Sequence, residues 1–381
     1  MPRSKPGVPS LLREMNDSAA LHHIMRTGEV TRAELAAHTG LSRVTSSQAL
    51  ARLESVGLVH STGRRTGARG PAADLYVLAP RVGVAWGMAL LADSVRAELC
   101  SLTGVVLARS SVPLGDDVVG AALTAAREVV AEAGTDAGPI HAAVVATPGV
   151  VDPNSGDLSF SYDLLQAPEL RRVLGEDLRV PLRLANDIHL AALAECREGV
   201  ARGENDFVLL WMGRGVGMAS VIDGKVRRGS SGAAGEIGYL PVPGVPLPTR
   251  VDQLDQGSFQ RLVGTPAVEE LRRHHDATPG ASDGPAKAFV ADLAARISLG
   301  VAAVGTILDP SLVVLTGEVS LGAGPELPGL VADATSRIAP IHPRVELSTL
   351  GVDGPLVGAR LEALDQAREV LMARVRETSA I

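Results

Sequence analysis

Several residue types that build particular classes of protein are scarce in this chain of 381 residues. It holds only two cysteines, Cys100 and Cys196, which are too few for a disulfide framework or a cysteine zinc site. Nine aromatic residues leave little material for stacking the bases of single-stranded nucleic acid. No apolar run reaches the length of a membrane span, and residues 1–9 lack the apolar core of a signal peptide. We therefore expect a cytoplasmic protein without a membrane partner.

The charged residues are distributed unevenly. The net charge is −7, and 46% of the residues are apolar, as in globular proteins of two or three domains. Residues 1–71 carry ten Lys and Arg against five Asp and Glu, which gives +5, so the rest of the chain carries −12. A basic head on an acidic body fits a small domain that binds a polyanion, joined to a larger domain that does not.

The segment 30–59 has the pattern of two short helices joined by a tight turn. Thr31 and Glu34 have the spacing of a capping box, in which each side chain accepts the other residue's backbone amide. Gly40 is suited to end the first helix, and Ser42 is suited to cap the second. Helix, short turn with glycine, helix is the signature of a helix-turn-helix. A plain helical hairpin inside a larger domain is the alternative.

The second helix of this pair projects polar side chains of the types that reach base edges and phosphates. We expect the DNA-binding residues of this helix to be Arg43, Thr45, Ser47, Gln48 and Arg52.

A basic loop follows between two strand candidates, 58–61 and 74–78. Two strands with a basic loop after a reading helix form a wing, in which we expect Arg64, Arg65 and Arg69 to lie along phosphates. A solvated linker is the alternative. With a helix over 10–26, these elements predict a winged helix-turn-helix domain over 10–78, preceded by a disordered arm at 1–9.

From Arg81 the pattern changes to meandering strands followed by alternating helices and strands, and it occurs twice. In the first half we predict strands at 82–91, 95–102, 105–111, 140–146 and 182–185, with helices at 116–133, 167–174 and 187–199. In the second half we predict strands at 207–212, 218–222, 225–228 and 312–316, with helices at 258–263, 267–274, 287–308, 326–338 and 355–376. The repetition indicates an α/β body over 79–381, made of two similar lobes with a cleft between them. The first lobe would comprise about 79–190 and the C-terminal helix 355–376, and the second about 191–350.

From about residue 10 to the C-terminus the chain resembles the ROK family (repressors, open reading frames and kinases) in its transcriptional-regulator branch. The resemblance is carried by LSRVTSSQALARLESVGLV, GRRTGARGPA, ANDIHLAALAE, GAAGEIGYLPV and LDPSLVVLTGEV, in that order. It implies an N-terminal winged helix on a two-lobed, actin-like body related to sugar kinases.

The phosphate-binding motifs of the family's kinases are altered in this chain. Their Asp-x-Gly-x-Thr turn is matched by Ala89-Leu90-Leu91-Ala92-Asp93, in which Leu91 blocks close approach and Asp93 repels phosphate. The second loop, 213–217, keeps its glycines but has Arg214 where the family has Thr. We interpret Arg214 as an unselected replacement in a lapsed loop, with binding of an anion as the alternative. We therefore expect a protein that is not an enzyme and needs no cofactor.

The resemblance preserves the sugar side of the cleft better. It implies that Asn186 and Asp187 bind a sugar, with a helix-capping role as the alternative, and that Glu236 supplies a second carboxylate. The remaining effector-binding positions it implies are Gly149, Asp163 and Tyr239. Tyr239 replaces the family's zinc-binding His and residues 243–257 contain no Cys, so we expect no metal.

These observations lead to the hypothesis of a transcriptional regulator, a repressor by resemblance, that binds double-stranded operator DNA as a homodimer or tetramer. Its effector would be a sugar or sugar derivative in the cleft. A DNA-binding oligomer without an effector and an active sugar kinase are the alternatives.

Overall fold

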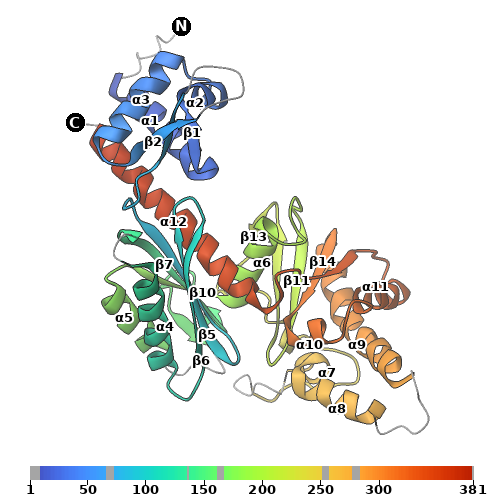
Figure 1. Ribbon diagram of the computed structural model, residues 1–381. Coiled ribbons are helices and arrows are strands. Elements are labelled where there is room, and N and C mark those ends of the chain that lie inside the picture. Colours follow the sequence, from blue (N-terminus) through green and yellow to red (C-terminus); the bar gives the residue numbers. More distant parts are fainter. Residues whose placement is uncertain are drawn as a thin grey trace.

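The computed structural model describes residues 9–65, 73–134, 137–160, 167–250, 257–276 and 284–379. Within these residues the chain forms a head of helices around a three-stranded sheet, and a body with two five-stranded sheets (Figure 1).

Local capping interactions fix the two helices of the helix-turn-helix. The amide of Glu34 donates to Thr31 Oγ1 over 3.2 Å, and the amide of Thr31 donates to the Glu34 carboxylate over 2.8 Å, so the predicted capping box is present. Gly40 follows α2 (Arg32–Thr39) with a left-handed φ of 72°. Ser42 Oγ accepts an amide at the start of the reading helix, α3 (Arg43–Ser55).

The rest of the head is a helix and a sheet that pack on this pair. The elements are α1 (Pro9–Thr27), β1 (Glu29–Thr31), β2 (Val59–Arg65) and β3 (Ala73–Leu78). The antiparallel pairing of β2 with β3 confirms the predicted wing, although β2 is longer than predicted and contains an irregularity between Ser61 and Arg64. Strand β1 was not predicted, because three residues are too few to show an alternating pattern.

The first lobe is a mixed sheet in the order β10-β7-β4-β5-β6. Its strands are β4 (Val84–Leu90), β5 (Ser94–Ser101), β6 (Val106–Pro113), β7 (Ile140–Thr147) and β10 (Leu182–Asn186), and its helices are α4 (Val118–Ala133) and α5 (Ala167–Leu178). Helix α6 (Asp187–Arg197) follows β10 and packs its buried alanines on the second sheet. Every residue of β4 is buried, which fits the continuous apolar pattern of a central strand covered on both faces. A short hairpin of β8 (Val150–Val151) and β9 (Leu158–Phe160) follows β7.

The second lobe repeats this topology in the order β13-β12-β11-β14-β15. Its strands are β11 (Phe207–Met212), β12 (Val216–Ile222), β13 (Lys225–Val226), β14 (Leu312–Thr316) and β15 (Arg344–Leu347), and its helices are α7 (Gln260–Val263), α8 (Thr265–Asp276), α9 (Gly284–Leu308), α10 (Gly317–Gly322) and α11 (Leu327–Ile338). In both lobes the first strand pairs antiparallel with the second and parallel with the fourth. The predicted duplication of the lobes is therefore confirmed.

Helix α9 corrects the expectation about apolar runs. The stretch Lys287–Leu308 is long and apolar enough to cross a membrane by length and composition, and 56% of its apolar window is buried inside the protein. Its buried face belongs to the core of the second lobe, through Phe289, Leu293 and Ile297 among others. A helix that is buried along most of its surface becomes apolar almost all round, which explains the long run.

The C-terminal helix α12 (Gly354–Ser379) joins the lobes to the head. It crosses the first sheet and α6, and its far end packs on α1 (Figure 1). Two glycines allow the close approach: a Cβ on Gly87 of β4 would lie 2.5 Å from the amide nitrogen of Arg360, and one on Gly358 would lie 2.0 Å from the carbonyl oxygen of Leu190.

Buried charges strengthen this junction. Arg360 of α12 lies 3.0 Å from Glu98 of β5 and 3.0 Å from Glu198, which follows α6. The side chains of Arg360 and Glu98 are both buried, and Arg109 also donates to Glu98 over 2.9 Å, so the buried charges are neutralised within a small network.

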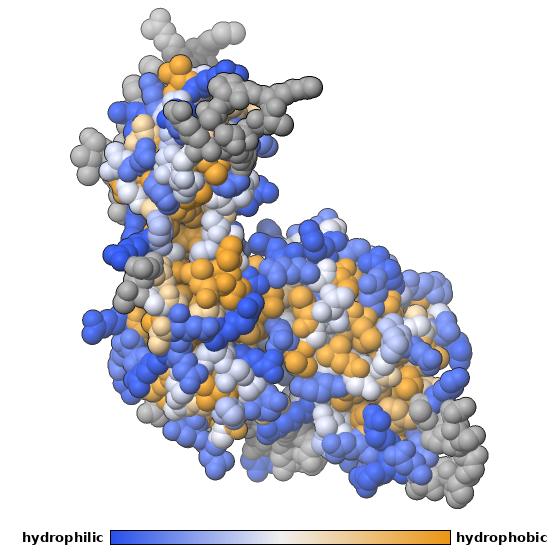
Figure 2. All heavy atoms as spheres, in the orientation of Figure 1, coloured by the Kyte–Doolittle hydropathy of each residue, from blue (hydrophilic) through white to orange (hydrophobic). Residues whose placement is uncertain are grey.

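A second arginine of α12 attaches the head. Arg368 donates to the carbonyl of Leu102 in the body over 2.9 Å and to the carbonyl of Met25 in α1 over 3.0 Å. The hydrophobic core is continuous across this contact, and Figure 2 shows hydrophobic residues along the neck between head and body. The head is therefore packed on the body instead of being tethered to it.

One residue of the reading helix is poorly suited to its position. Ser46 faces inward and is fully buried, and its hydroxyl has no hydrogen-bond partner in the part of the chain that the structure describes. We predict that Ser46→Ala raises the free energy of unfolding by about 1 kcal/mol, because it removes a buried, unsatisfied hydroxyl. Urea unfolding of the full chain measures this, with Ser47→Ala on the same helix as the control. A destabilised Ser46→Ala variant would show that the hydroxyl has a partner in solution.

Candidate functional sites: the reading face and the interlobe cleft

The reading helix presents most of its predicted DNA-binding residues to solvent. Arg43 and Gln48 are exposed, and Thr45 and Ser47 are partly exposed. The hydroxyl of Thr45 shares a hydrogen bond of 2.8 Å with Ser42 Oγ at the helix cap. These four residues therefore remain candidates for contact with bases or phosphates.

Arg52 differs from these four residues because it forms an ion pair inside the head, and its contact with DNA stays a prediction. Its guanidinium donates to both oxygens of Asp17 on α1, with Nε–Oδ2 at 2.9 Å and Nη2–Oδ1 at 2.6 Å. This hydrogen bonding raises the pKa of Arg52. Asp17 is only 2% exposed, so without Arg52 it would be a buried and unpaired charge. Arg52 therefore holds α3 against α1. The sequence did not show this role because Arg52 and Asp17 are far apart in the chain.

The wing residues are only partly within the described chain. Arg64 and Arg65 lie at the end of β2, with backbones opposite Asp74 and Ala73 of β3. Arg69 lies outside the described residues. Their contacts with DNA stay predictions.

Between the two lobes lies a cavity of about 560 Å³, and both sheets contribute to its walls. Five of the six predicted effector-binding residues line it: Gly149, Asn186, Asp187, Glu236 and Tyr239. They come from three segments that are separate in the sequence, at Gly149, Asn186–Asp187 and Glu236–Tyr239, and the fold brings these segments together. Asp163 lies outside the described residues.

Asn186 has a structural role that the resemblance does not imply. Its Oδ1 accepts the amide of His189 over 2.9 Å and so caps α6, while its Nδ2 donates to the carbonyl of Gly149 over 2.9 Å. The structure therefore assigns the helix cap to Asn186, and Asp187 next to it is the first residue of the helix.

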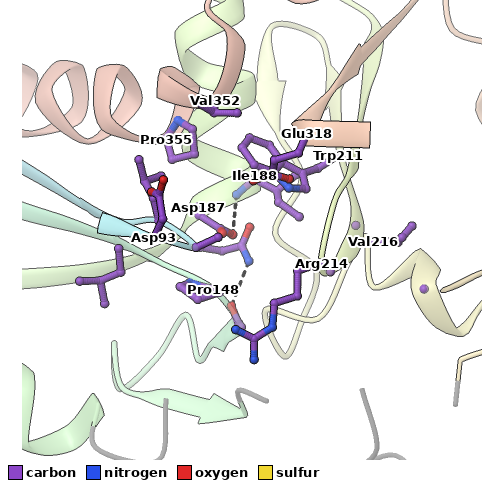
Figure 3. A pocket seen from close by; sticks show the side chains of 18 of the residues that line it. Asp93, Pro148, Asp187, Ile188, Trp211, Arg214, Val216, Glu318, Val352 and Pro355 are labelled. Atoms are coloured by element: carbon purple, nitrogen blue, oxygen red, sulfur yellow. Dashed lines mark hydrogen bonds between the residues drawn. The ribbon is translucent and has the colours of Figure 1, made fainter. Parts of the chain in front are cut away.

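Asp187 is the most strongly perturbed acid of the cleft. Burial raises its pKa to about 7, the amide of Ile188 partly opposes this, and the carboxylates of Glu236 and Glu318 add to it. Ile188 donates to Asp187 Oδ1 over 2.8 Å (Figure 3). An acid with a pKa near neutrality in a cleft is a frequent feature of functional sites.

Glu236 is placed by a glycine beside it. Gly235 has a φ of 99°, and a Cβ there would lie 1.9 Å from the carbonyl oxygen of Met218, so only glycine fits against β12. The imidazole of His189 is 3.2 Å from the carbonyl oxygen of Ala234, which ties this loop to α6. Burial raises the pKa of Glu236 as well.

The loop Gly213–Gly217 keeps its shape through a side chain of the protein. Gln260 Oε1 accepts the amide of Val216 over 2.8 Å, and its Nε2 donates to the carbonyl of Arg214 over 2.7 Å. The carboxylate of Glu318 lies against Gly213, where an added Cβ would be 2.0 Å from Oε2. A phosphate at this loop would meet the negative charge of Glu318.

Glu318 is a site residue that the sequence reasoning missed. It follows the buried strand β14 as the second residue of α10, and Figure 3 shows it in the same pocket as Asp187. The sequence signal that could have identified Glu318 is its position directly after a parallel strand, because side chains at the carboxyl ends of such strands lie together at the cleft. The altered turn at Leu91 and Asp93 also lines the cavity.

An ion pair links the lobes at the edge of the cleft and was also missed. Arg96 of β5 donates to Asp353, which lies just before α12. The partners are 257 residues apart in sequence, so no local pattern indicates the pair.

Among the described residues no group of three or more His, Cys, Asp or Glu is arranged to hold a metal ion. Cys100 is buried and Cys196 half-buried, and burial raises the pKa of the Cys100 thiol to about 11.

The comparisons with known proteins decide the family. The model of the ROK family matches residues 86–365. The chain belongs to the ROK family. A model of the MarR family matches residues 14–70, which contain the helix-turn-helix.

The relatives include both regulators and kinases. The chain is 25% identical to the DNA-binding transcriptional dual regulator NagC of Escherichia coli K12, over 69% of the chain and 66% of that protein. A ROK family transcriptional regulator described as a homologue of the E. coli MLC protein matches 96% of the chain and 99% of its own, with a TM-score of 0.68 and 18% identity. The ROK hexokinase of Thermus thermophilus matches 73% of the chain and 97% of its own, with a TM-score of 0.59 and 29% identity.

These matches confirm the fold, a winged helix-turn-helix followed by a two-lobed actin-like body. The alignments span between 42% and 66% of the length of the curated relatives.

The raised pKa of Asp187 predicts a pH dependence of stability. The carboxyl ionises near 3.8 in the unfolded chain and near 7 in the folded one, so the folded state binds one more proton between these values. Stability therefore falls as the pH rises from about 4 to about 7, by at most about 1.4 kcal/mol per pH unit. Asp187→Asn should remove this slope and unfold at a higher temperature than the wild type at pH 8. Asp333→Asn, an exposed change on α11, is the control, and equal slopes in all three proteins would contradict the assignment.

Proposed function

We propose that this chain is a DNA-binding transcriptional regulator that acts as a repressor, with an unphosphorylated sugar or sugar derivative as effector. The observation that carries the proposal is the joining of an exposed reading helix to a cleft whose phosphate loops are obstructed. The reading helix supplies Arg43 and Gln48, and the cleft contains Glu318 and Leu91 where a nucleotide would need space and positive charge.

The cleft favours a polar ligand without a phosphate group. Asp187, Glu236 and Glu318 supply hydrogen-bond acceptors from three elements around one cavity, as a polyhydroxylated ligand requires. A phosphate ester placed beside these carboxylates would be repelled, although Arg96 and Arg214 also line the cavity. The repulsion by Glu318 at the loop 213–217 also supports a protein without kinase activity, although kinases occur among its relatives.

The reading helix implies that the protein binds DNA as a symmetric assembly. We infer that this assembly acts in the cytoplasm. Helix-turn-helix proteins bind two half-sites about 34 Å apart, so we infer a homodimer or a tetramer on operator DNA. A ligand that binds between the lobes would bias their closure, and α12 contacts both the cleft and the head.

Gln48 provides the test of DNA reading. Its exposed amide can donate to and accept from an adenine edge, so Gln48→Ala should lose about 1–3 kcal/mol of discrimination at one base pair. Binding of the full chain to duplexes selected from a random pool, and to their single-base variants, measures this. Gln366→Ala on α12 is the matched control. An equal loss on every sequence would show that Gln48 is not a base reader, and failure of the wild type to bind any duplex would overturn the proposed function.

The effector is tested by thermal unfolding with paired ligands. We expect one member of a panel of sugars and amino sugars to stabilise the protein, by about 2.7 kcal/mol at one hundred times its Kd, while its phosphate ester gives no shift. Glu236→Gln should weaken the response, and Glu269→Gln on the surface of α8 is the control. If no member shifts the transition while DNA binding is intact, the chain is a ligand-independent oligomer. A shift with the phosphate ester would contradict the role given to Glu318.

A further inference from the structure

The reading helix carries an exposed apolar side chain that the predicted DNA contacts leave out. Val44, the second residue of α3, is 67% exposed. Single exposed apolar residues are common on protein surfaces, so exposure alone has no meaning. What distinguishes Val44 is its position, in the first turn of the helix between Arg43 and Thr45.

Val44 shares one face of the helix with Gln48 and Ala51. The three residues follow at intervals of four and three, which places them in one row, and all three are exposed. The opposite face is buried and contains Ser46, Ala49, Leu50 and Leu53. The row is therefore the surface that a major groove would meet if α3 is the reading helix.

Val44 has no role in the cap of α3 that would explain a valine there. Ser42 caps the helix through its hydroxyl, and the hydrophobic staple of such a cap joins the residue before the cap to the fourth helical residue. Those positions are Leu41 and Ser46, and Ser46 is polar. The valine is available for contact outside the protein.

The chemistry of the groove defines what such a side chain can recognise. Val44 can neither donate nor accept a hydrogen bond, and the C5 methyl group of thymine is the apolar group that the major groove displays. We propose that Val44 reads a thymine methyl group in the operator, beside the base pair contacted by Gln48. This inference rests on the proposed function. It makes Val44 a specificity-determining residue that prefers an A·T pair at one position of each half-site.

Replacement of thymine by deoxyuridine tests the proposal, because it removes only the methyl group. Half-sites are first selected from random duplexes with the full-length protein, and each thymine is then replaced singly by deoxyuridine. We expect wild-type affinity to fall about fourfold at one thymine, as for the loss of one buried methyl group. Val44→Ala should bind the thymine and uracil duplexes with equal affinity at that position.

Two control variants separate this result from a general weakening. Val56 is the C-cap residue at the other end of α3, and its side chain is 45% exposed. Val56→Ala removes this exposed valine and should keep the wild-type response to uracil. Gln48→Ala should also keep that response while losing its own base preference. Circular dichroism and thermal unfolding of each variant confirm that the protein is folded.

Two outcomes overturn the inference while the proposed function stands. In one, the wild type binds its selected sites specifically but tolerates uracil at every thymine. In the other, Val44→Ala retains the full sensitivity to uracil. Absence of specific binding by the wild type would instead overturn the proposed function itself.

Discussion

The ion pairs of Arg360 hold together the elements on which the two-lobed body depends. This guanidinium neutralises Glu98 on the first sheet and contacts Glu198 after α6, at the point where α12 passes between them. Glycines 87 and 358 let the backbones approach closely enough for these contacts. Since α12 begins beside the cleft and ends on the head, its position fixes the spatial relation between the two sites.

The two sites differ in how they are built. The reading face is built from local interactions, because capping groups within a few residues of α3 determine the direction of this helix. The cleft is assembled from segments that span most of the body, and burial there raises the pKa of Asp187, with a smaller contribution from the neighbouring carboxylates. Such a site can respond to a change in the relation of the lobes, whereas the reading face is built within the head alone.

The sequence predicted most elements of the fold because their signals are local. The capping box at Thr31, the glycine that ends α2 and the buried strand β14 are all visible in short windows. The sequence did not show that Arg52 pairs with Asp17, or that Arg96 pairs with Asp353, because these partners meet only after folding. The contact of Asn186 with the carbonyl of Gly149 belongs to the same class, whereas its capping of α6 is local and was among the alternatives that the sequence offered.

Gln260 satisfies part of the loop 213–217 without a ligand. Its side chain accepts the amide of Val216 and donates to the carbonyl of Arg214, so these backbone groups need no nucleotide to complete their hydrogen bonds. The glycine-rich loop therefore keeps its shape as part of the folded protein. Its shape alone is no sign that a nucleotide binds, and the groups around it, Arg214 and Glu318 among them, decide which ligand fits there.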